Sequence, residues 1–229
     1  MSSSPARARV AWNLTGLVAD DGRGRLDLAA PAAGVVTAGG DQLLGLDLRS
    51  PAAAIRLTDH WVRGDDLVGV YEPADPRRLR ATAMWRSLAS NDAWEVVVSA
   101  QTALVESDSA LAVTCELGDG PIAWGRGPEA GGRWNQQAGD TIPAEATCVL
   151  VRRGAEAVLV AVHPADARRM LVARDAGRLR ITCWLFTAAI EKGVLLRSRV
   201  LAAVGPSADT AWADALVQGL ATSPPPLSA

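Results

Sequence analysis

The sequence predicts an all-β protein: a large, mostly antiparallel sandwich of two sheets with a C-terminal helix. Three observations lead to this fold class. Apolar and polar residues alternate along much of the 229-residue chain, as they do in strands that bury one face. Asp-Gly, Gly-Gly and Ser-Pro pairs separate the alternating segments, and such pairs are typical of turns. Eight of the ten aromatic residues are Trp, a side chain large enough to fill the space between two sheets.

The strand predicted at residues 78–86 shows the alternation most clearly. Its apolar face carries Leu79, Ala81, Ala83 and Trp85. Its polar face carries Arg78, Arg80, Thr82 and Arg86. Because successive side chains of a strand point to opposite faces, we expect this strand to be half buried. On the same grounds, further strands are predicted in the first half of the chain at residues 8–18, 25–29, 43–48, 54–58, 67–71, 93–102 and 111–117.

The second half of the chain repeats this pattern. The strands predicted at residues 146–153 and 155–163 form a hairpin, in which Gly154 supplies the positive φ that a tight turn requires. Two more strands are predicted at residues 178–186 and 194–204. No linker or internal repeat interrupts the chain, so residues 1–229 are expected to form one domain, with residues 1–9 and 223–229 frayed.

A helix is predicted after residue 206. Ser207 is expected to cap its N-terminus. Trp212, Leu216 and Leu220 then fall at positions i, i+4 and i+8, which gives the helix one apolar stripe. We expect this stripe to pack over the sandwich.

Composition excludes several classes of function. The 23 basic and 25 acidic residues give a net charge of −2, and no run of one sign is long enough to follow a nucleic-acid backbone. No apolar run approaches the roughly 20 residues of a membrane-spanning helix, and the N-terminus lacks a secretory signal, so a cytoplasmic location is expected. Cys115, Cys148 and Cys183 lie far apart, which argues against a disulfide framework or a zinc site. Phosphate-loop, dinucleotide-binding and zinc-protease motifs are missing, so neither a cofactor nor a metal is predicted.

Two segments resemble known families. Residues 59–68, Asp-His-Trp-Val-Arg-Gly-Asp-Asp-Leu-Val, together with Trp85-Arg86 and residues 97–102, Val-Val-Ser-Ala-Gln-Thr, resemble a bacterial, chiefly planctomycete, protein family. That resemblance implies no particular activity. Residues 191–200, Glu-Lys-Gly-Val-Leu-Leu-Arg-Ser-Arg-Val, resemble a late strand of the galactose-mutarotase-like supersandwich folds. This second resemblance implies a sandwich that binds sugars across a broad sheet.

The mutarotase resemblance assigns no catalytic residue. Enzymes of that type use two histidines and a carboxylate around the sugar ring, and this chain has only His60 and His163. The number of histidines therefore agrees. The residues around each histidine do not match that family's motifs, so neither receives a role from the resemblance.

The first candidate binding region is the Gly-rich loop predicted at residues 118–140. Long loops inside compact domains are usually functional or disordered. An indole can pack on the apolar face of a pyranose, while amide, guanidinium and carboxylate groups bind pairs of hydroxyls. The alternative is a surface loop whose Trp side chains fold back on the sandwich. The candidate ligand-binding residues of this loop are Trp124, Arg126, Glu129, Trp134 and Asn135.

The second candidate region precedes the strand at residues 67–71. Here Arg63 and Asp65 are predicted to form a polar clamp, with His60 as an acid or base whose pKa lies close to neutrality. The alternative is purely structural. In that case Arg63 pairs with an Asp, and Gly64 takes positive φ in a turn.

Three functions remain open from the sequence. The first is a carbohydrate-binding sandwich without its own catalysis. The second is a mutarotase-like sugar isomerase or lyase with His60 or His163 as the proton carrier. The third is an assembly protein, for instance a homo-oligomer. The strand at 178–186 is apolar on both faces, with Trp184 and Phe186 on one of them, so it needs a cover, either the C-terminal helix or another subunit.

Overall fold

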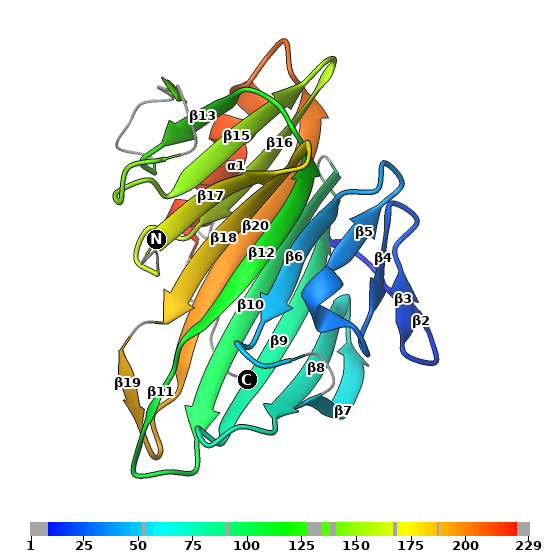
Figure 1. Cartoon of the computed structure of the whole chain (residues 1–229). Coiled ribbons are helices and arrows are strands. Elements are labelled where there is room, and N and C mark those ends of the chain that lie inside the picture. Colours follow the sequence, from blue (N-terminus) through cyan, green and yellow to red (C-terminus); the bar gives the residue numbers. More distant parts are fainter. Residues whose placement is uncertain are drawn as a thin grey trace, which may run out of the picture.

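Two large antiparallel sheets face each other in the computed structural model, which confirms the predicted sandwich (Figure 1). The structure describes residues 9–51, 54–89, 92–127, 134–137, 141–166, 169–186 and 188–223. Glu129 and most of the terminal residues expected to fray lie outside these ranges. Each sheet contains strands from both halves of the chain.

Sheet A has ten strands. Their order is β14 (Asn135–Gln137), β13 (Ile122–Gly125), β15 (Cys148–Arg153), β16 (Glu156–Val162), β20 (Leu196–Pro206), β10 (Asp92–Thr102), β9 (Leu79–Leu88), β8 (Asp66–Pro73) and β7 (Ile55–Arg63), with β1 (Arg9–Val10) paired to β9. Strands β7 and β14 therefore form opposite edges of this sheet.

Sheet B has eight strands. Their order is β17 (Arg169–Asp175), β18 (Arg178–Phe186), β12 (Leu111–Gly118), β6 (Gln42–Asp47), β5 (Val35–Thr37), β4 (Gly24–Asp27), β3 (Val18–Asp20) and β2 (Asn13–Thr15). Two short strands, β11 (Glu106–Asp108) and β19 (Ala189–Glu191), pair separately, and a 3-10 turn, η1 (Pro31–Ala33), precedes β5.

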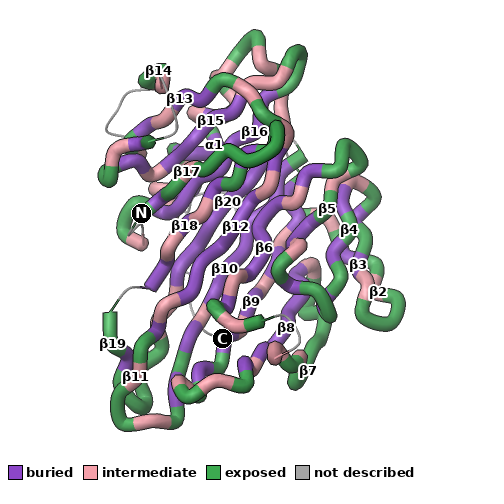
Figure 2. Tube along the Cα trace, in the orientation of Figure 1, coloured by how far each residue is buried: buried purple, intermediate pink, exposed green. Residues whose placement is uncertain are grey.

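The space between the sheets is filled by the apolar faces that the alternation predicts. Figure 2 shows buried residues along the central strands and exposed residues in the peripheral loops. Trp85 is completely buried, and its indole Nε1–H donates to the carbonyl oxygen of Leu44 at 3.2 Å. The Trp12 indole donates to the Trp85 carbonyl oxygen at 3.2 Å. The ring of Tyr71 meets that of Trp85 edge to face at 6.3 Å. These aromatic residues belong to the core.

Two buried carboxylates connect the sheets. Asp41, in the turn before β6, accepts hydrogen bonds from both terminal nitrogens of Arg153 on β15, at 2.7 and 2.6 Å. Asp21 accepts a bond from the Trp94 indole at 2.7 Å and another from the Ser87 hydroxyl. Burial raises the pKa of the Asp21 carboxyl, but these and backbone hydrogen bonds outweigh it and hold that pKa below its ordinary value. These two carboxylates are thus paired, as buried charges must be.

The C-terminal helix, α1 (Ala211–Thr222), covers the face of sheet A that points away from sheet B (Figure 1). Its apolar stripe packs on residues of β15, β16 and β20 such as Leu150, Leu159 and Leu201. Ser207 does not cap the helix, contrary to prediction. Its hydroxyl donates to the carbonyl oxygen of Gly154 at 2.6 Å, and the carboxylate of Asp209 accepts the Ala211 amide at 2.9 Å.

Strand β18 is not covered by α1, because it lies in the other sheet. The pairing of β18 with β12 skips Leu185. As a result both Leu185 and Phe186 reach the core, where they are 1% and 6% exposed. Trp184 stays on the outer face, where the Arg49 guanidinium lies 4.8 Å from the centre of its ring. A β-bulge therefore separates two aromatic residues that strict alternation assigns to one face.

His163 lies directly after β16, and its side chain is only 10% exposed. Burial lowers the pKa of its imidazole, and the Arg199 guanidinium on β20 lowers it further. The carboxylates of Asp166 and Glu95 act in the opposite direction. Arg199 also donates to the Ser223 hydroxyl at 2.8 Å, directly after α1. The neutral imidazole is therefore part of the packing beneath the end of the helix.

Acidification is expected to weaken the fold through His163. The pKa of His163 in the folded protein lies below the ordinary value of about 6.5. The stability that the neutral imidazole contributes is therefore fully present above about pH 6.5, and it declines as the pH falls towards the folded pKa. The unfolding free energy should drop by at most about 1.4 kcal/mol per pH unit in that window. Urea unfolding between pH 7.5 and 5.5 measures this slope. His163→Gln should flatten it, whereas a flatter slope with His60→Gln instead would assign the effect to the exposed imidazole.

Candidate functional site

A hollow of about 990 Å³ lies at one end of sheet A. It is formed where β7 begins, β8 ends, β9 begins and β10 ends, at the lower end of the molecule in Figure 1. The turn before β20 adds Lys192 and Gly193 to its wall. We call this hollow the groove. Its volume is at the upper end of the range of about 300–1,000 Å³ that small-molecule sites occupy.

A row of four polar side chains crosses the groove. Arg56 lies opposite Glu72 in the β7–β8 ladder, and Gln101 lies opposite Arg80 in the β9–β10 ladder. The Glu72 carboxylate is 3.0 Å from the Arg56 Nη2 and 3.8 Å from the Arg80 Nε. These ion pairs are exposed and contribute little to stability. Their hydrogen-bonding atoms face solvent and are available to a ligand.

A β-bulge extends this polar face along β7. The β7–β8 pairing skips Thr58, so Asp59 lies opposite Val70 and Trp61 opposite Val68. Asp59 and Trp61 therefore share the face of Arg56; without the extra residue they would point to the other side. A second hollow of about 470 Å³, lined by Asp59, joins the groove through the shared Arg56, Glu72 and Arg80. Trp61 is 40% exposed next along this face.

A rigid loop between β8 and β9 forms another part of the wall. The Arg77 guanidinium donates to the carbonyl oxygens of Leu48 and Ala110 at 2.5 and 2.6 Å. It also donates to the Asp75 carboxylate at 2.9 Å, and that carboxylate accepts the Ser50 hydroxyl at 3.1 Å. The loop is thereby tied to the ends of two strand regions of sheet B, which fixes the groove relative to the sandwich.

The second candidate region, with His60, Arg63 and Asp65, partly adjoins this groove. Arg63 is exposed at the end of β7, on the same face as Asp59 and Trp61. His60 is exposed on the opposite face of the strand. Asp65 lies in the turn, beside Gly64 with φ of 58°. Arg63 and Asp65 have no ion-pair partner among the described residues. Strand β7 extends to residue 63, well beyond the predicted end at 58.

The first candidate region, the Gly-rich segment at 118–140, lies at the other end of the strand order in sheet A. Residues 122–125 and 135–137 form β13 and β14, where a loop was predicted. Trp124 packs against the core, while Trp134 donates its indole N–H to the Asp214 carboxylate of α1 at 2.9 Å. Arg126 and Asn135 are exposed, and Glu129 lies outside the described residues. The two predicted regions therefore do not form one site.

Sequence reasoning missed the polar row itself. Arg56, Glu72, Arg80 and Gln101 come from four strands, and only the strand register brings them together. The polar face of the strand predicted at 78–86 already contained Arg80. Nothing in the chain indicated which polar faces of other strands lie beside it.

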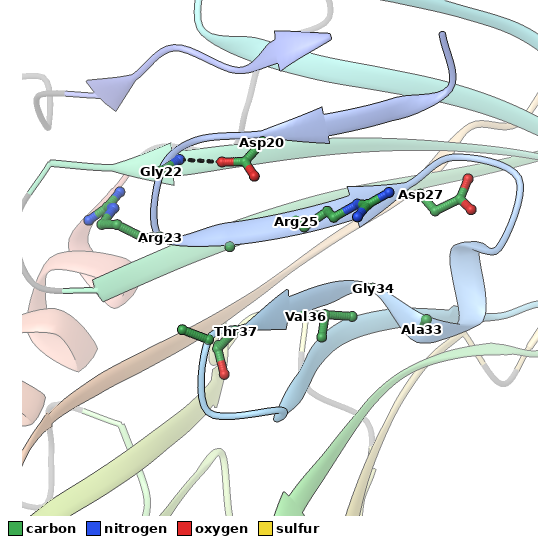
Figure 3. Close-up of a pocket in the computed structure, with 11 residues that line it drawn as sticks. Asp20, Gly22, Arg23, Arg25, Asp27, Ala33, Gly34, Val36 and Thr37 are labelled. Carbon is green, nitrogen blue, oxygen red and sulfur yellow. Dashed lines mark hydrogen bonds between the residues drawn. The ribbon is translucent and has the colours of Figure 1, made fainter. Parts of the chain in front are cut away.

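A third hollow, of about 510 Å³, lies on sheet B beside the β3–β4 turn (Figure 3). Asp20 is engaged in that turn, because its carboxylate accepts the Gly22 amide at 2.6 Å. Arg25 and Asp27 also line the hollow, but no aromatic residue does. The groove on sheet A is the stronger candidate, because it has both a row of open polar groups and an exposed indole nearby.

Neither histidine lines any of these three hollows. The three cysteines are buried and free. Burial raises the pKa of the Cys115 thiol to about 12 and that of Cys148 to about 11, so both are protonated at neutral pH. In the described part of the chain, no three His, Cys, Asp or Glu side chains are grouped to hold a metal ion. No helix there is long and apolar enough to cross a membrane.

No protein-family model and no curated protein sequence matches this chain. Solved structures do match its fold. YeaD, a mutarotase candidate from Salmonella typhimurium, superposes with a TM-score of 0.53 at 11% identity, over 87% of this chain and 97% of YeaD. The chain has a mutarotase-type sandwich fold. This result agrees with the fold implied by the resemblance at residues 191–200.

Two further structures are similar to parts of this mutarotase-type sandwich. An aldose 1-epimerase candidate from Escherichia coli K12 has a TM-score of 0.48 at 12% identity, over 65% of this chain and 68% of that protein. The GH36 α-galactosidase AgaA from Geobacillus stearothermophilus has a TM-score of 0.43 at 12% identity, over 74% of this chain. The chain spans only 29% of the length of that galactosidase.

Proposed function

We propose that the protein binds carbohydrate in the groove of sheet A and does not itself catalyse a reaction. The observation that carries this proposal is the row of open polar groups, Arg56, Glu72, Arg80 and Gln101, which leads along one face towards the exposed Trp61. Pairs of sugar hydroxyls suit guanidinium, carboxylate and amide groups, each of which binds two at once. The indole offers a flat surface for the apolar face of a pyranose.

The charge arrangement favours binding over catalysis. Glu72 lies between two guanidinium groups, those of Arg56 and Arg80. An isomerase of the mutarotase type requires an imidazole near a carboxylate in one cleft. The groove has no histidine in its wall, and His163 with its neighbour Asp166 lies buried beneath the end of α1. The fold likeness to YeaD supports a sugar as the ligand class, and the site chemistry supports a binder.

Titration calorimetry with a panel of neutral and acidic oligosaccharides tests the proposal. We expect Glu72→Gln and Trp61→Ala each to weaken binding about tenfold or more, which corresponds to about 1.4 kcal/mol. Both side chains are exposed, so the folded state should tolerate the changes. Trp212→Phe, an indole substitution on α1 away from the groove, is the matched control and should leave the affinity unchanged.

Two outcomes would contradict the proposal. One is the absence of heat and of any tryptophan fluorescence change across the whole panel. The other is saccharide binding that survives both groove substitutions at the wild-type affinity, because such binding must occur elsewhere on the molecule.

A further inference from the structure

The groove carries an excess of positive charge. Four cationic side chains and two carboxylates line it, so the lining carries a net charge of +2. Arg56 and Arg80 share the Glu72 carboxylate, and the Asp75 carboxylate is engaged by Arg77. The side chains of the two remaining cations, Arg78 and Lys192, have no hydrogen bond or ion pair with any described residue. The whole chain has a net charge of −2, so this local excess is not a general property of the protein.

The backbone of Arg78 is held in an unusual conformation. Its φ is 46°, in the left-handed region that residues other than Gly, Asn and Asp rarely adopt. The preceding residue explains how this conformation persists. The Arg77 carbonyl oxygen accepts the hydroxyls of Thr102 at 2.9 Å and Ser107 at 3.0 Å, and its guanidinium is bound on three sides. Strained residues held by their surroundings cluster at ligand sites.

Lys192 reaches the same hollow from a different part of the chain. It lies in the turn after β19, where Gly193 has φ of 86°. The backbone amide of Lys192 donates to the carbonyl oxygen of Val105 at 3.2 Å, which ties the turn to the segment before β11. Two unpaired cations are therefore presented to one cavity by two separately anchored loops.

We infer that the groove selects acidic saccharides, with an anionic group on the sugar bound between Arg78 and Lys192. This inference rests on the proposed carbohydrate binding and specifies its ligand class. The planar fork of a guanidinium matches a carboxylate or sulfate group in two parallel hydrogen bonds, and an ammonium adds a point charge. Glu72 repels an anion from the middle of the groove. The acidic group is thus directed to the Arg78 end, and the neutral part of the chain extends towards Asp59 and Trp61.

The test compares three soluble oligosaccharides of equal length by calorimetry: an oligogalacturonate, a sulfated glucan and a neutral glucan. The wild-type protein should bind at least one acidic ligand about tenfold or more tightly than the neutral one, with an affinity that falls as salt increases. Arg78→Asn, which tolerates positive φ, and Lys192→Gln should each remove most of this preference and leave neutral binding within about twofold. Arg25→Gln on sheet B is the matched charge control and should change nothing.

The outcomes separate this inference from the function on which it rests. A preference for carboxylate or for sulfate supports it and identifies the anion. Equal binding of acidic and neutral ligands by the wild type overturns the inference while carbohydrate binding stands. No binding of any saccharide overturns both. Equally tight binding of polyglutamate that Arg78→Asn also abolishes shows a general anion site, and it overturns selection for saccharides. Thermal unfolding of each variant confirms that it remains folded.

Discussion

Replacement of Arg77 by Met is expected to lower the unfolding free energy by about 3 kcal/mol. This is the lower end of the range of about 3–5 kcal/mol for removing one partner of a buried ion pair, because the Arg77–Asp75 pair is only partly buried. The substitution leaves the Asp75 carboxylate, which is only 15% exposed, without its cation. It also removes the guanidinium N–H groups that donate hydrogen bonds to the carbonyl oxygens of Leu48 and Ala110. The loop that presents Arg78 then loses its anchor, so the preference for acidic saccharides should be lost as well.

Urea unfolding and calorimetry of the same samples measure both effects. Arg77→Lys keeps the positive charge but lacks the planar guanidinium. Compared with Arg77→Met, it should therefore recover part of the unfolding free energy but little of the loop geometry. Arg25→Met removes an exposed guanidinium on sheet B and should change the unfolding free energy by less than about 0.5 kcal/mol. Arg77→Met with wild-type stability and wild-type binding would show that this side chain does not hold the groove wall.

Replacement of Trp85 by Ala is expected to cost about 3–5 kcal/mol, as large-to-small changes of buried aromatic residues do. Trp85 is completely buried between the sheets and contacts the edge of the Tyr71 ring. Its removal opens a cavity and leaves the Leu44 carbonyl oxygen without the indole donor. The melting temperature should fall by about 6–20 °C, since each kcal/mol corresponds to about 2–4 °C for a protein of this size.

Scanning calorimetry measures this change. Trp61→Ala removes the same atoms from a site that is 40% exposed, and it should cost less than about 1 kcal/mol. The two variants therefore separate core packing from ligand binding. Trp61→Ala should lower the sugar affinity, whereas Trp85→Ala should lower the unfolding free energy. Equal stability losses in the two variants would contradict this division of the indoles.

Much of the fold follows from local pattern. The alternation at residues 78–86 identified β9 and assigned Trp85 to the core and Arg80 to the polar face, as observed. The hairpin about Gly154 and the stripe of α1 were likewise predicted, because periodicity and glycine conformation depend on neighbouring residues alone. The exceptions have local causes that alternation does not encode. The bulge at Leu185 turned Phe186 inwards, and two short strands of sheet A were hidden in a Gly-rich segment.

The candidate site was less accessible from the sequence. The prediction placed binding residues in segments dense in polar and aromatic groups, around His60 and around Trp134. The structure instead brings Arg56, Glu72 and Arg80 into one row through strand pairing. It also gives Trp134 a partner on α1, Asp214, 80 residues away in the chain. Contacts at such separations depend on register and topology, which a single sequence pattern does not specify.

By itself, the sequence determined which side of each strand is apolar, because side-chain direction in a strand alternates residue by residue. It therefore determined that the protein is a sandwich and that Trp85 is a core residue. Only the tertiary structure decided which polar faces lie together, and that the bulge at Thr58 turns Trp61 to the face of Arg56. The physical reason is that a one-residue shift in pairing reverses every later side chain, and the energy that selects the register comes from the whole packed sheet.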